Sequence, residues 1–250
     1  GGRVIQATMS FDPVRQTTRV LREKENADDY RYFADPDLIP LLISETQIEK
    51  AREAMPELPE VETVRRELEP WLRGRRIVRA RRAEAPPGPK YADLERAGGQ
   101  MISAVTRRGK FLILPLSRGD ELIIHLGMTG VVSATKPPAH LRVVLDLSGK
   151  RRNRLYFRDV RRFGRFLVLP GGDPAPLPAL ARMGPEPLSE DFQPGSFFAA
   201  LRSKSAIKTF LLSQRPVAGL GNIYIDEALW QARIHPLTPA NRVPRKKAAV

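Results

Sequence analysis

Seven short apolar segments follow one another between residues 77 and 169, and their spacing leaves few folds open to the chain. The segments are rich in Val, Ile, Leu and Phe, and turn residues separate them. Short strands at this spacing are typical of a β-sandwich or a β-barrel. They are expected at Ile77–Arg82, Met101–Thr106, Phe111–Leu116, Glu121–Leu126, Leu141–Leu147, Leu155–Phe157 and Arg165–Leu169.

Helical patterns lie on both sides of these segments. Residues Val61–Leu72 place four apolar side chains on one helical face, and Gly74 is a plausible stop. A linker is expected at residues 170–174. Shorter helices are expected beyond it, at residues 197–201, 207–212 and 222–230, the last with Asn222 as its N-cap. The order of elements predicts an α+β fold.

Charge is distributed unevenly along the 250 residues. Residues 1–54 contain 8 Lys and Arg against 10 Asp and Glu, a net charge of −2. The whole chain carries +14, so taking −2 from +14 leaves +16 for residues 55–250. Such a basic segment is typical of polyanion binding, most often to nucleic acid, although a generally basic protein would show the same excess. The step at residue 55 indicates two segments of different origin.

Composition narrows the remaining classes. There is no cysteine, which removes disulfides and thiolate metal sites and fits a cytoplasmic protein. No apolar run reaches the ~18 residues of a membrane span, so no membrane contact is expected. The first residues lack a signal-peptide profile and a starting methionine, so the chain is expected to be a fragment.

The stretch Met55-Pro56-Glu57-Leu58-Pro59-Glu60 marks the start of the basic segment. If Pro56 were the first residue, its secondary amine could attack an aldehyde-level carbon and give an iminium ion, with Glu57 and Glu60 beside it as acid/base candidates. In the chain as it stands Pro56 follows 55 residues, so its nitrogen is an amide and cannot attack. A plain linker is the alternative reading of this stretch.

The first 54 residues resemble a segment of the B subunit of the aspartyl/glutamyl-tRNA amidotransferase. The matching stretches are residues 6–8, Arg22-Glu23-Lys24-Glu25, Asp29-Tyr30-Arg31-Tyr32-Phe33 and Asp35-Pro36-Asp37-Leu38. That family also continues into a Pro-Glu-Leu-Pro near this point. The two halves are therefore expected to be joined at this tetrapeptide, by a real fusion or by an assembly artefact.

Residues 55–250 resemble the formamidopyrimidine-DNA glycosylase family of bifunctional base-excision repair enzymes. Six motifs occur in order, and together they are very specific. They are Met55–Thr63, Arg107-Arg108-Gly109-Lys110, His125-Leu126-Gly127-Met128-Thr129-Gly130, Arg161-Arg162-Phe163-Gly164, Met183-Gly184-Pro185-Glu186-Pro187-Leu188, and Gly219-Leu220-Gly221-Asn222-Ile223-Tyr224 with Glu227.

The resemblance implies a catalytic set of Pro56, Glu57, Lys110 and Glu60. Pro56, freed as an amine, would attack C1′ of the damaged nucleotide, expel the base and allow β- and then δ-elimination. Glu57 would be the general acid that opens the sugar, and Glu60 a supporting carboxylate. Lys110 would contact phosphate and the active site. Glu60 could equally be a surface acid at a helix start, and Lys110 an ordinary hairpin lysine.

The resemblance also implies a set of DNA contacts. His125 and Arg162 would bind phosphates, although His125 taken alone reads as a core histidine. Met128, Arg161 and Phe163 would fill the gap left by the extruded nucleotide, and Arg161 could bond the orphaned base. Simple core packing is the alternative for Met128 and Phe163.

Two further contacts are implied in the helical part. Asn222, at the start of a helix after a glycine-hinged turn, matches the family's helix–two-turn–helix element, where free N–H groups bind phosphate. Lys208 would contact phosphate or the lesion. Glu227 matches a carboxylate near the site, or is a plain surface residue of its helix.

Several departures from the family pattern stand out. The family's four-cysteine zinc finger, the rest of the helical domain and the lesion-capping loop are missing, so no zinc or other cofactor is expected in this chain. Val160 stands where the family usually has proline, and Pro56 is internal.

The expected domains are an amidotransferase-B-like fragment at 1–54, a β-sandwich glycosylase domain at 55–184 and a partial helix–two-turn–helix domain at 185–250. The expected protein is a monomeric, bacterial, nucleoid-associated enzyme that removes oxidised purines from double-stranded DNA once Pro56 is exposed. The alternatives are a catalytically inactive DNA-binding remnant and an amidotransferase subunit fragment; the acidic charge and small size of the matching part argue against the latter.

Overall fold

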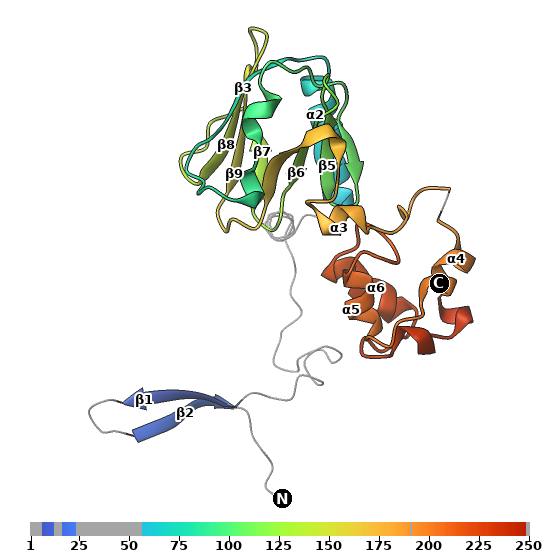
Figure 1. The fold of residues 1–250 in the computed structure, drawn as a ribbon. Coiled ribbons are helices and arrows are strands. Elements are labelled where there is room, and N and C mark those ends of the chain that lie inside the picture. Colours follow the sequence, from blue (N-terminus) through green and yellow to red (C-terminus); the bar gives the residue numbers. More distant parts are fainter. Residues whose placement is uncertain (1–6, 13–16, 24–56, 191, 249–250) are drawn as a thin grey trace, which may run out of the picture. The chain divides into compact units, whose positions relative to one another are not determined.

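The computed structural model describes residues 7–12, 17–23, 57–190 and 192–248. The chain divides into two compact units, residues 1–48 and 49–250. In the first unit, β1 (Ala7–Asp12) and β2 (Thr17–Glu23) form an antiparallel hairpin (Figure 1). Pro56 and the amidotransferase-like motifs at residues 29–38 lie outside the described residues.

The second unit begins with α2 (Leu58–Leu72), which leads into two antiparallel sheets of four strands each. The strand order is β3-β8-β9-β7 in one sheet and β10-β6-β5-β4 in the other. The bounds are β3 Ile77–Arg82, β4 Thr106–Arg108, β5 Phe111–Pro115, β6 Glu121–His125, β7 Gly130–Ser133, β8 Leu141–Leu147, β9 Arg154–Asp159 and β10 Arg165–Leu169.

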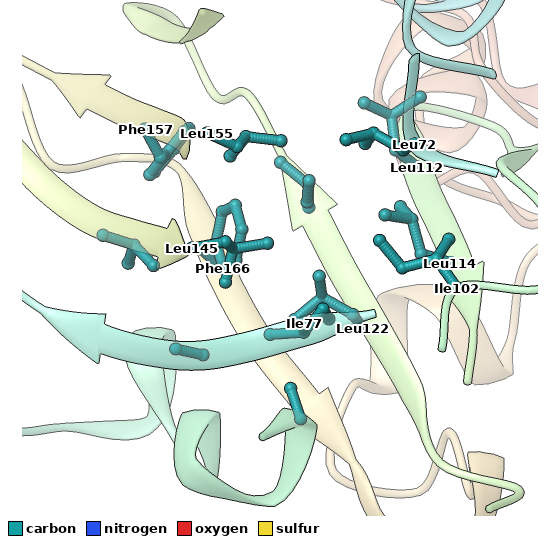
Figure 2. Close-up of a cluster of buried hydrophobic side chains, with 14 of the residues drawn as sticks. Leu72, Ile77, Ile102, Leu112, Leu114, Leu122, Leu145, Leu155, Phe157 and Phe166 are labelled. Atoms are coloured by element: carbon teal, nitrogen blue, oxygen red, sulfur yellow. The ribbon is translucent and has the colours of Figure 1, made fainter. Parts of the chain in front are cut away.

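The main core lies between the two sheets and α2 (Figure 2). Leu145 and Phe157 enter it from one sheet, Leu112 and Phe166 from the other, and Leu72 from the end of the helix, all with 0% exposure. Each such side chain contributes about 1.5–3 kcal/mol through removal of apolar surface from water. The expected β-sandwich with a leading helix is confirmed.

The sheet that contains β6 is buried on both faces. Its outer side chains, among them Phe111, Ile123 and Leu167, pack on Leu177, next to the short helix α3 (Pro178–Ala181). Two covered faces explain why β6 and β10 read as continuous apolar runs and not as alternating ones.

One expected strand is wrong. Residues 101–106 form only isolated bridges, from Met101 to Arg76 and from Ile102 to Leu116, before β4 begins at Thr106. The backbone here pairs first with the segment after α2 and then with the residue after β5. A continuous ladder with one neighbouring strand therefore does not form. The four-residue strand β7 is present, although its sequence gave no clear signal.

The helical part contains α4 (Pro194–Ala200), α5 (Ile207–Leu212) and α6 (Asn222–Gln231). These agree with the expected helices, except that α4 starts earlier, at a proline suited to a first helical position. They share a small core that includes Ile207, Leu211 and Ile225. Among the described residues, no helix is long and apolar enough to span a membrane.

Candidate active site

Glu57 connects the sandwich to the helical part. It is the N-cap of α2 and is only 1% exposed. Its backbone N–H donates to Glu60 Oε2 at 3.0 Å, as in a capping box. Its carboxylate accepts backbone N–H groups from Gly221 at 2.7 Å, Ile223 at 3.0 Å and Tyr224 at 3.4 Å. One carboxylate therefore sits at the N-termini of two helices.

This arrangement corrects the expected cap of α6. Gly221, not Asn222, occupies the N-cap position, and Asn222 is the exposed first residue of the helix. The free N–H groups of this terminus find their acceptor in Glu57, whose negative charge also suits the positive end of the helix dipole. Because the acceptor lies more than 160 positions earlier, no local pattern reveals it.

Lys110 lies beside Glu57, in the turn between β4 and β5. A Cβ placed on Gly221 would collide with both the Glu57 carboxylate and the Lys110 ammonium, so the two groups meet over this glycine. Burial lowers the pKa of Lys110, while the carboxylates of Glu57 and Glu60 oppose this effect. The site thus combines a half-buried amine with two acids.

Residues 184–186, just before the helical part, bind the turn that carries Lys110 and hold it in place. Gly109 donates its N–H to Glu186, and Arg108 donates to the carbonyl of Gly184 at 2.7 Å. Arg107 lies between Glu186 at 2.8 Å and Glu62 at 3.2 Å. Arg107 and Arg108 therefore hold the turn in place, and the sequence motif around Glu186 has a structural explanation.

His125 ends β6 close to the same turn. Its Nδ1 accepts the Gly127 N–H at 3.2 Å, and its ring lies 4.7 Å from that of Phe111, measured between centroids. Burial, followed by the positive charges of Lys110 and Arg165, lowers the pKa of His125 to about 4. The imidazole is therefore neutral at pH 7, and its proton is on Nε2, which leaves a hydrogen-bond donor for a ligand.

The β9–β10 turn, residues 160–163, carries Arg161, Arg162 and Phe163 on the surface. Phe163 is 47% exposed, and the Arg161 guanidinium lies 4.8 Å from its ring centroid. Met128 and Val160 border a hollow of about 440 Å³ that Glu60 also lines. Of the residues expected to fill a gap in DNA, Arg161 and Phe163 are exposed, and the half-buried Met128 adjoins an open space together with Val160.

Two residues that the sequence did not single out organise this turn. Asp159, 0% exposed, accepts the Thr129 hydroxyl at 2.6 Å and the Gly164 N–H at 2.7 Å. Thr129 in turn accepts the Arg161 N–H at 3.0 Å. Since Thr129 follows Met128 directly, the pair ties both gap-filling segments together. The signals in the sequence were the place of Thr129 within the motif that begins at His125 and the position of Asp159 just before the motif that begins at Arg161.

The other expected residues lie on the helical part. Lys208 on α5 forms an ion pair with Asp226 on α6, with Nζ 2.6 Å from Oδ1. Glu227 is exposed on α6. Among the described residues no group of three or more His, Cys, Asp or Glu could hold a metal, and the sequence has no cysteine, so the residues in hand do not fit a thiolate zinc site.

Family models match most of the chain. The formamidopyrimidine-DNA glycosylase N-terminal domain matches residues 55–166, and the formamidopyrimidine-DNA glycosylase H2TH domain matches residues 183–250. The GatB/GatE catalytic domain matches residues 2–49. The boundary expected at residue 55 stays a prediction.

Curated relatives and solved structures agree with the two longer matches. A formamidopyrimidine-DNA glycosylase from Deinococcus radiodurans is 50% identical over 192 residues, covering 73% of this chain and 66% of the relative. One from Thermus thermophilus is 46% identical over 195 residues, covering 78% and 70%. The chain thus spans about two thirds of the length of these relatives.

Solved structures give the same result. The crystal structure of the MutM (Fpg) protein from Thermus thermophilus matches with a TM-score of 0.70 and 44% identity, over 78% of this chain and 71% of that one. The Lactococcus lactis formamidopyrimidine-DNA glycosylase bound to DNA containing an abasic site matches with a TM-score of 0.67 and 35% identity, over 78% and 75%.

Proposed function

The chain belongs to the formamidopyrimidine-DNA glycosylase family of bifunctional DNA repair enzymes, and we propose that it excises oxidised purines from double-stranded DNA and cleaves the abasic strand. The substrates are 8-oxoguanine and formamidopyrimidines, and the enzyme acts as a monomer in the bacterial cytoplasm, at the nucleoid. The observation that carries the proposal is that Glu57 and Lys110 come together at the N-terminus of α6. Glu57 is also the residue that follows Pro56 in the sequence.

The proposed chemistry requires a free Pro56 amine. Its nitrogen bonds to C1′ as the bond from C1′ to the base breaks. The C1′–O4′ bond then breaks, with a proton going to O4′, and the iminium forms. The iminium acidifies the C2′ protons, so loss of one of them breaks the C3′–O3′ bond and releases the phosphate. Glu57 exchanges a proton with the sugar oxygen, and the three backbone donors that fix its carboxylate support this role. Lys110 brings positive charge to the phosphate or the leaving base, and Glu60 supports Glu57 from the first turn of α2.

The proposed DNA contacts extend from this centre. Neutral His125 donates from Nε2 to a phosphate, and Arg162 contacts another. Met128, Arg161 and Phe163 enter the gap left by the extruded nucleotide. The exposure of Arg161 and Phe163 and the open space beside Met128 support this role. In the helical part, Asn222 and Lys208 bind the phosphate backbone, and Lys208 must exchange Asp226 for phosphate to do so.

A second candidate function is DNA binding without catalysis. It is favoured by the 55 residues that precede Pro56, because they make its nitrogen an amide. The charge of +16 on residues 55–250 would still support salt-dependent, mostly nonspecific binding.

Borohydride trapping separates the two functions, because only an iminium can be reduced to a covalent adduct. We would compare the 250-residue chain with one that begins at Pro56, on a duplex with one 8-oxoguanine and on an undamaged duplex. The proposed activity gives an adduct only with the Pro56-first chain on damaged DNA. Lesion binding without any adduct from that chain would leave binding alone as the function.

A further inference from the structure

A second hollow, of about 410 Å³, lies beside the β9–β10 turn. One wall is the segment Pro86–Tyr91, and the other is formed by Arg161, Arg162 and Phe163. Its volume falls within the ~300–1,000 Å³ that is usual for small-molecule sites. Residues 86–91 belong to none of the motifs that define the proposed catalytic site, so the proposed function gives this wall of the pocket no role.

The charge of the pocket is unbalanced. Lys90, Arg161 and Arg162 line it, and its lining includes no carboxylate. Three cations around one concave surface attract an anion, and Arg and Lys are the usual partners of phosphate. The pocket therefore suits a ligand that carries phosphate.

The rest of the lining is apolar and stiff. Pro86, Pro87 and Pro89 supply ring surfaces whose backbone φ angles are fixed, and the half-exposed Phe163 ring supplies an aromatic face. A planar base can stack on such an aromatic face whatever its sequence identity. Rigid walls also reduce the entropy lost on binding. Phosphate and base together make a nucleotide unit.

Lys90 holds the two walls together. Its Nζ donates to the carbonyl of Arg162 at 2.6 Å and lies 6.0 Å from the Phe163 ring centroid. Arg162 has a left-handed backbone with φ of 57°, which is uncommon for a residue other than glycine, and the bond from Lys90 stabilises it. An ammonium has three donors, so Lys90 can bind a phosphate while it keeps this contact.

Tyr91 adds an unused donor. It lines the pocket, is only 3% exposed, and its hydroxyl has no hydrogen-bond partner within the described part of the chain. Burial, and then the charge of Asp159, raise the pKa of Tyr91, so the phenol keeps its proton. A buried hydroxyl without a partner is costly, and a bound ligand would satisfy it.

We propose that this pocket is a subsite for one nucleotide of the DNA strand opposite the lesion. The base lies against the proline and Phe163 surfaces, and its phosphate contacts Lys90. The choice of strand rests on the proposed function, in which Arg161, a pocket residue, bonds the base left without a partner. The subsite adds a contact to the strand that is not cleaved.

A phosphate-by-phosphate scan tests the subsite with the full 250-residue chain, without any need for catalysis. Duplexes with a stable abasic analogue carry one neutral methylphosphonate at successive positions of the opposite strand and, in a second set, of the lesion strand, and binding is measured by fluorescence anisotropy. We expect one position at which neutralisation weakens wild-type binding about five- to tenfold and Lys90→Met binding not at all. Lys150→Met removes the same charge outside the pocket and should keep the wild-type loss.

Two more variants separate binding from folding. Lys90→Arg keeps the charge and the donor and should restore the position-specific loss. Tyr91→Phe removes the unpaired hydroxyl, so thermal stability should stay equal or rise while DNA affinity falls about threefold.

Three results would overturn the subsite: equal losses for wild type and Lys90→Met at every position, a coupled position on the lesion strand, or unchanged affinity in Tyr91→Phe. Equal binding to damaged and undamaged duplexes would instead contradict the proposed function. The Lys90 coupling would still be measurable on either duplex.

Discussion

Glu57 shows how much one buried side chain can organise. It begins α2, and its two carboxylate oxygens satisfy three backbone donors at the start of α6. Such free N–H groups need an acceptor when they are removed from water, and a charged acceptor gives the stronger bonds. Structure and proposed chemistry therefore depend on the same carboxylate.

Glu57→Gln should destabilise the fold as well as the reaction. An amide keeps one acceptor oxygen but presents an NH₂ group to the other N–H donors, so we expect a loss of about 1–3 kcal/mol in the free energy of unfolding. Urea unfolding measures it, and hydrogen exchange at Ile223 and Tyr224 should speed up. Glu227→Gln, on the exposed face of the same helix, should change stability by less than about 0.5 kcal/mol. Equal effects of the two substitutions would rule out the capping role.

His125 predicts a pH dependence of stability. Its pKa is lowered from 6.5 to about 4 in the folded chain, so between these values the unfolded chain binds more protons. This contribution is complete above about pH 6.5 and is lost as pH falls toward 4, by on the order of 3 kcal/mol.

The contribution of His125 is measured by comparing the unfolding free energies of wild type and His125→Gln at pH 7, 5.5 and 4.5. The carboxylates titrate alike in both proteins, so their contribution cancels in the comparison. Wild type should lose more stability than the variant over this range. Parallel curves would mean that the imidazole is not held neutral.

At the scale of elements, the β9–β10 turn is a surface loop fixed by a buried acid. Asp159 lies below the turn, and Thr129 links it to the start of β7. These hydrogen bonds fix the backbone of the turn, so its exposed side chains are available to contact DNA. Loops that carry function on a rigid support follow this general pattern.

Asp159→Asn should loosen this turn. Asparagine cannot accept from both the Thr129 hydroxyl and the Gly164 N–H without turning a donor toward one of them, so we expect about 1–3 kcal/mol of destabilisation. Affinity for lesion DNA should fall more than affinity for undamaged DNA, since Arg161 and Phe163 of this turn enter the gap only where a nucleotide is extruded.

Asp146→Asn is the matched control, on the neighbouring strand β8. Asp146 is partly exposed and pairs with Arg81 and Arg154 at the surface, so its loss should cost less than about 1 kcal/mol. An Asp159→Asn protein with unchanged lesion preference would show that the turn does not depend on its support.

At the scale of the whole molecule, Glu186 links the sandwich to the chain that enters the helical part. It approaches Arg107 as an ion pair at 2.8 Å without the direction of a hydrogen bond, and it accepts the Gly109 N–H. The two side chains are only 11% and 18% exposed, so water screens their attraction weakly. This link holds the Lys110 turn and the chain leading to α6 in one arrangement.

A double-mutant cycle measures this link. Arg107→Met, Glu186→Gln and the double variant should give a coupling of about 1–3 kcal/mol in urea unfolding. The pair of Arg73 and Glu69, in which the arginine side chain is 69% exposed, should give a coupling below about 0.5 kcal/mol. A coupling near zero for Arg107 and Glu186 would mean that the orientation of the helical part is set elsewhere.

The sequence alone was sufficient for the fold class and most of the elements. Strand and helix periodicity depends on neighbours within a few residues. The bounds of β3, β8 and β10 were therefore predicted as the structure has them, and α2 was predicted from Val61 where it begins at Leu58. The motifs around Glu57, Lys110 and Phe163 likewise lie within short stretches of chain, and the resemblance to the family depends on them.

The tertiary structure alone decided which groups meet. Glu57 caps α6 and Lys90 contacts Arg162, and both interactions join residues that are remote in sequence. Asp159 supports the β9–β10 turn from a fully buried position, which is unusual for an aspartate. Segments 101–106 failed as a strand for the same reason, because pairing depends on which neighbour arrives. Local pattern determines how a segment can fold, whereas burial and partners arise only when distant segments pack together.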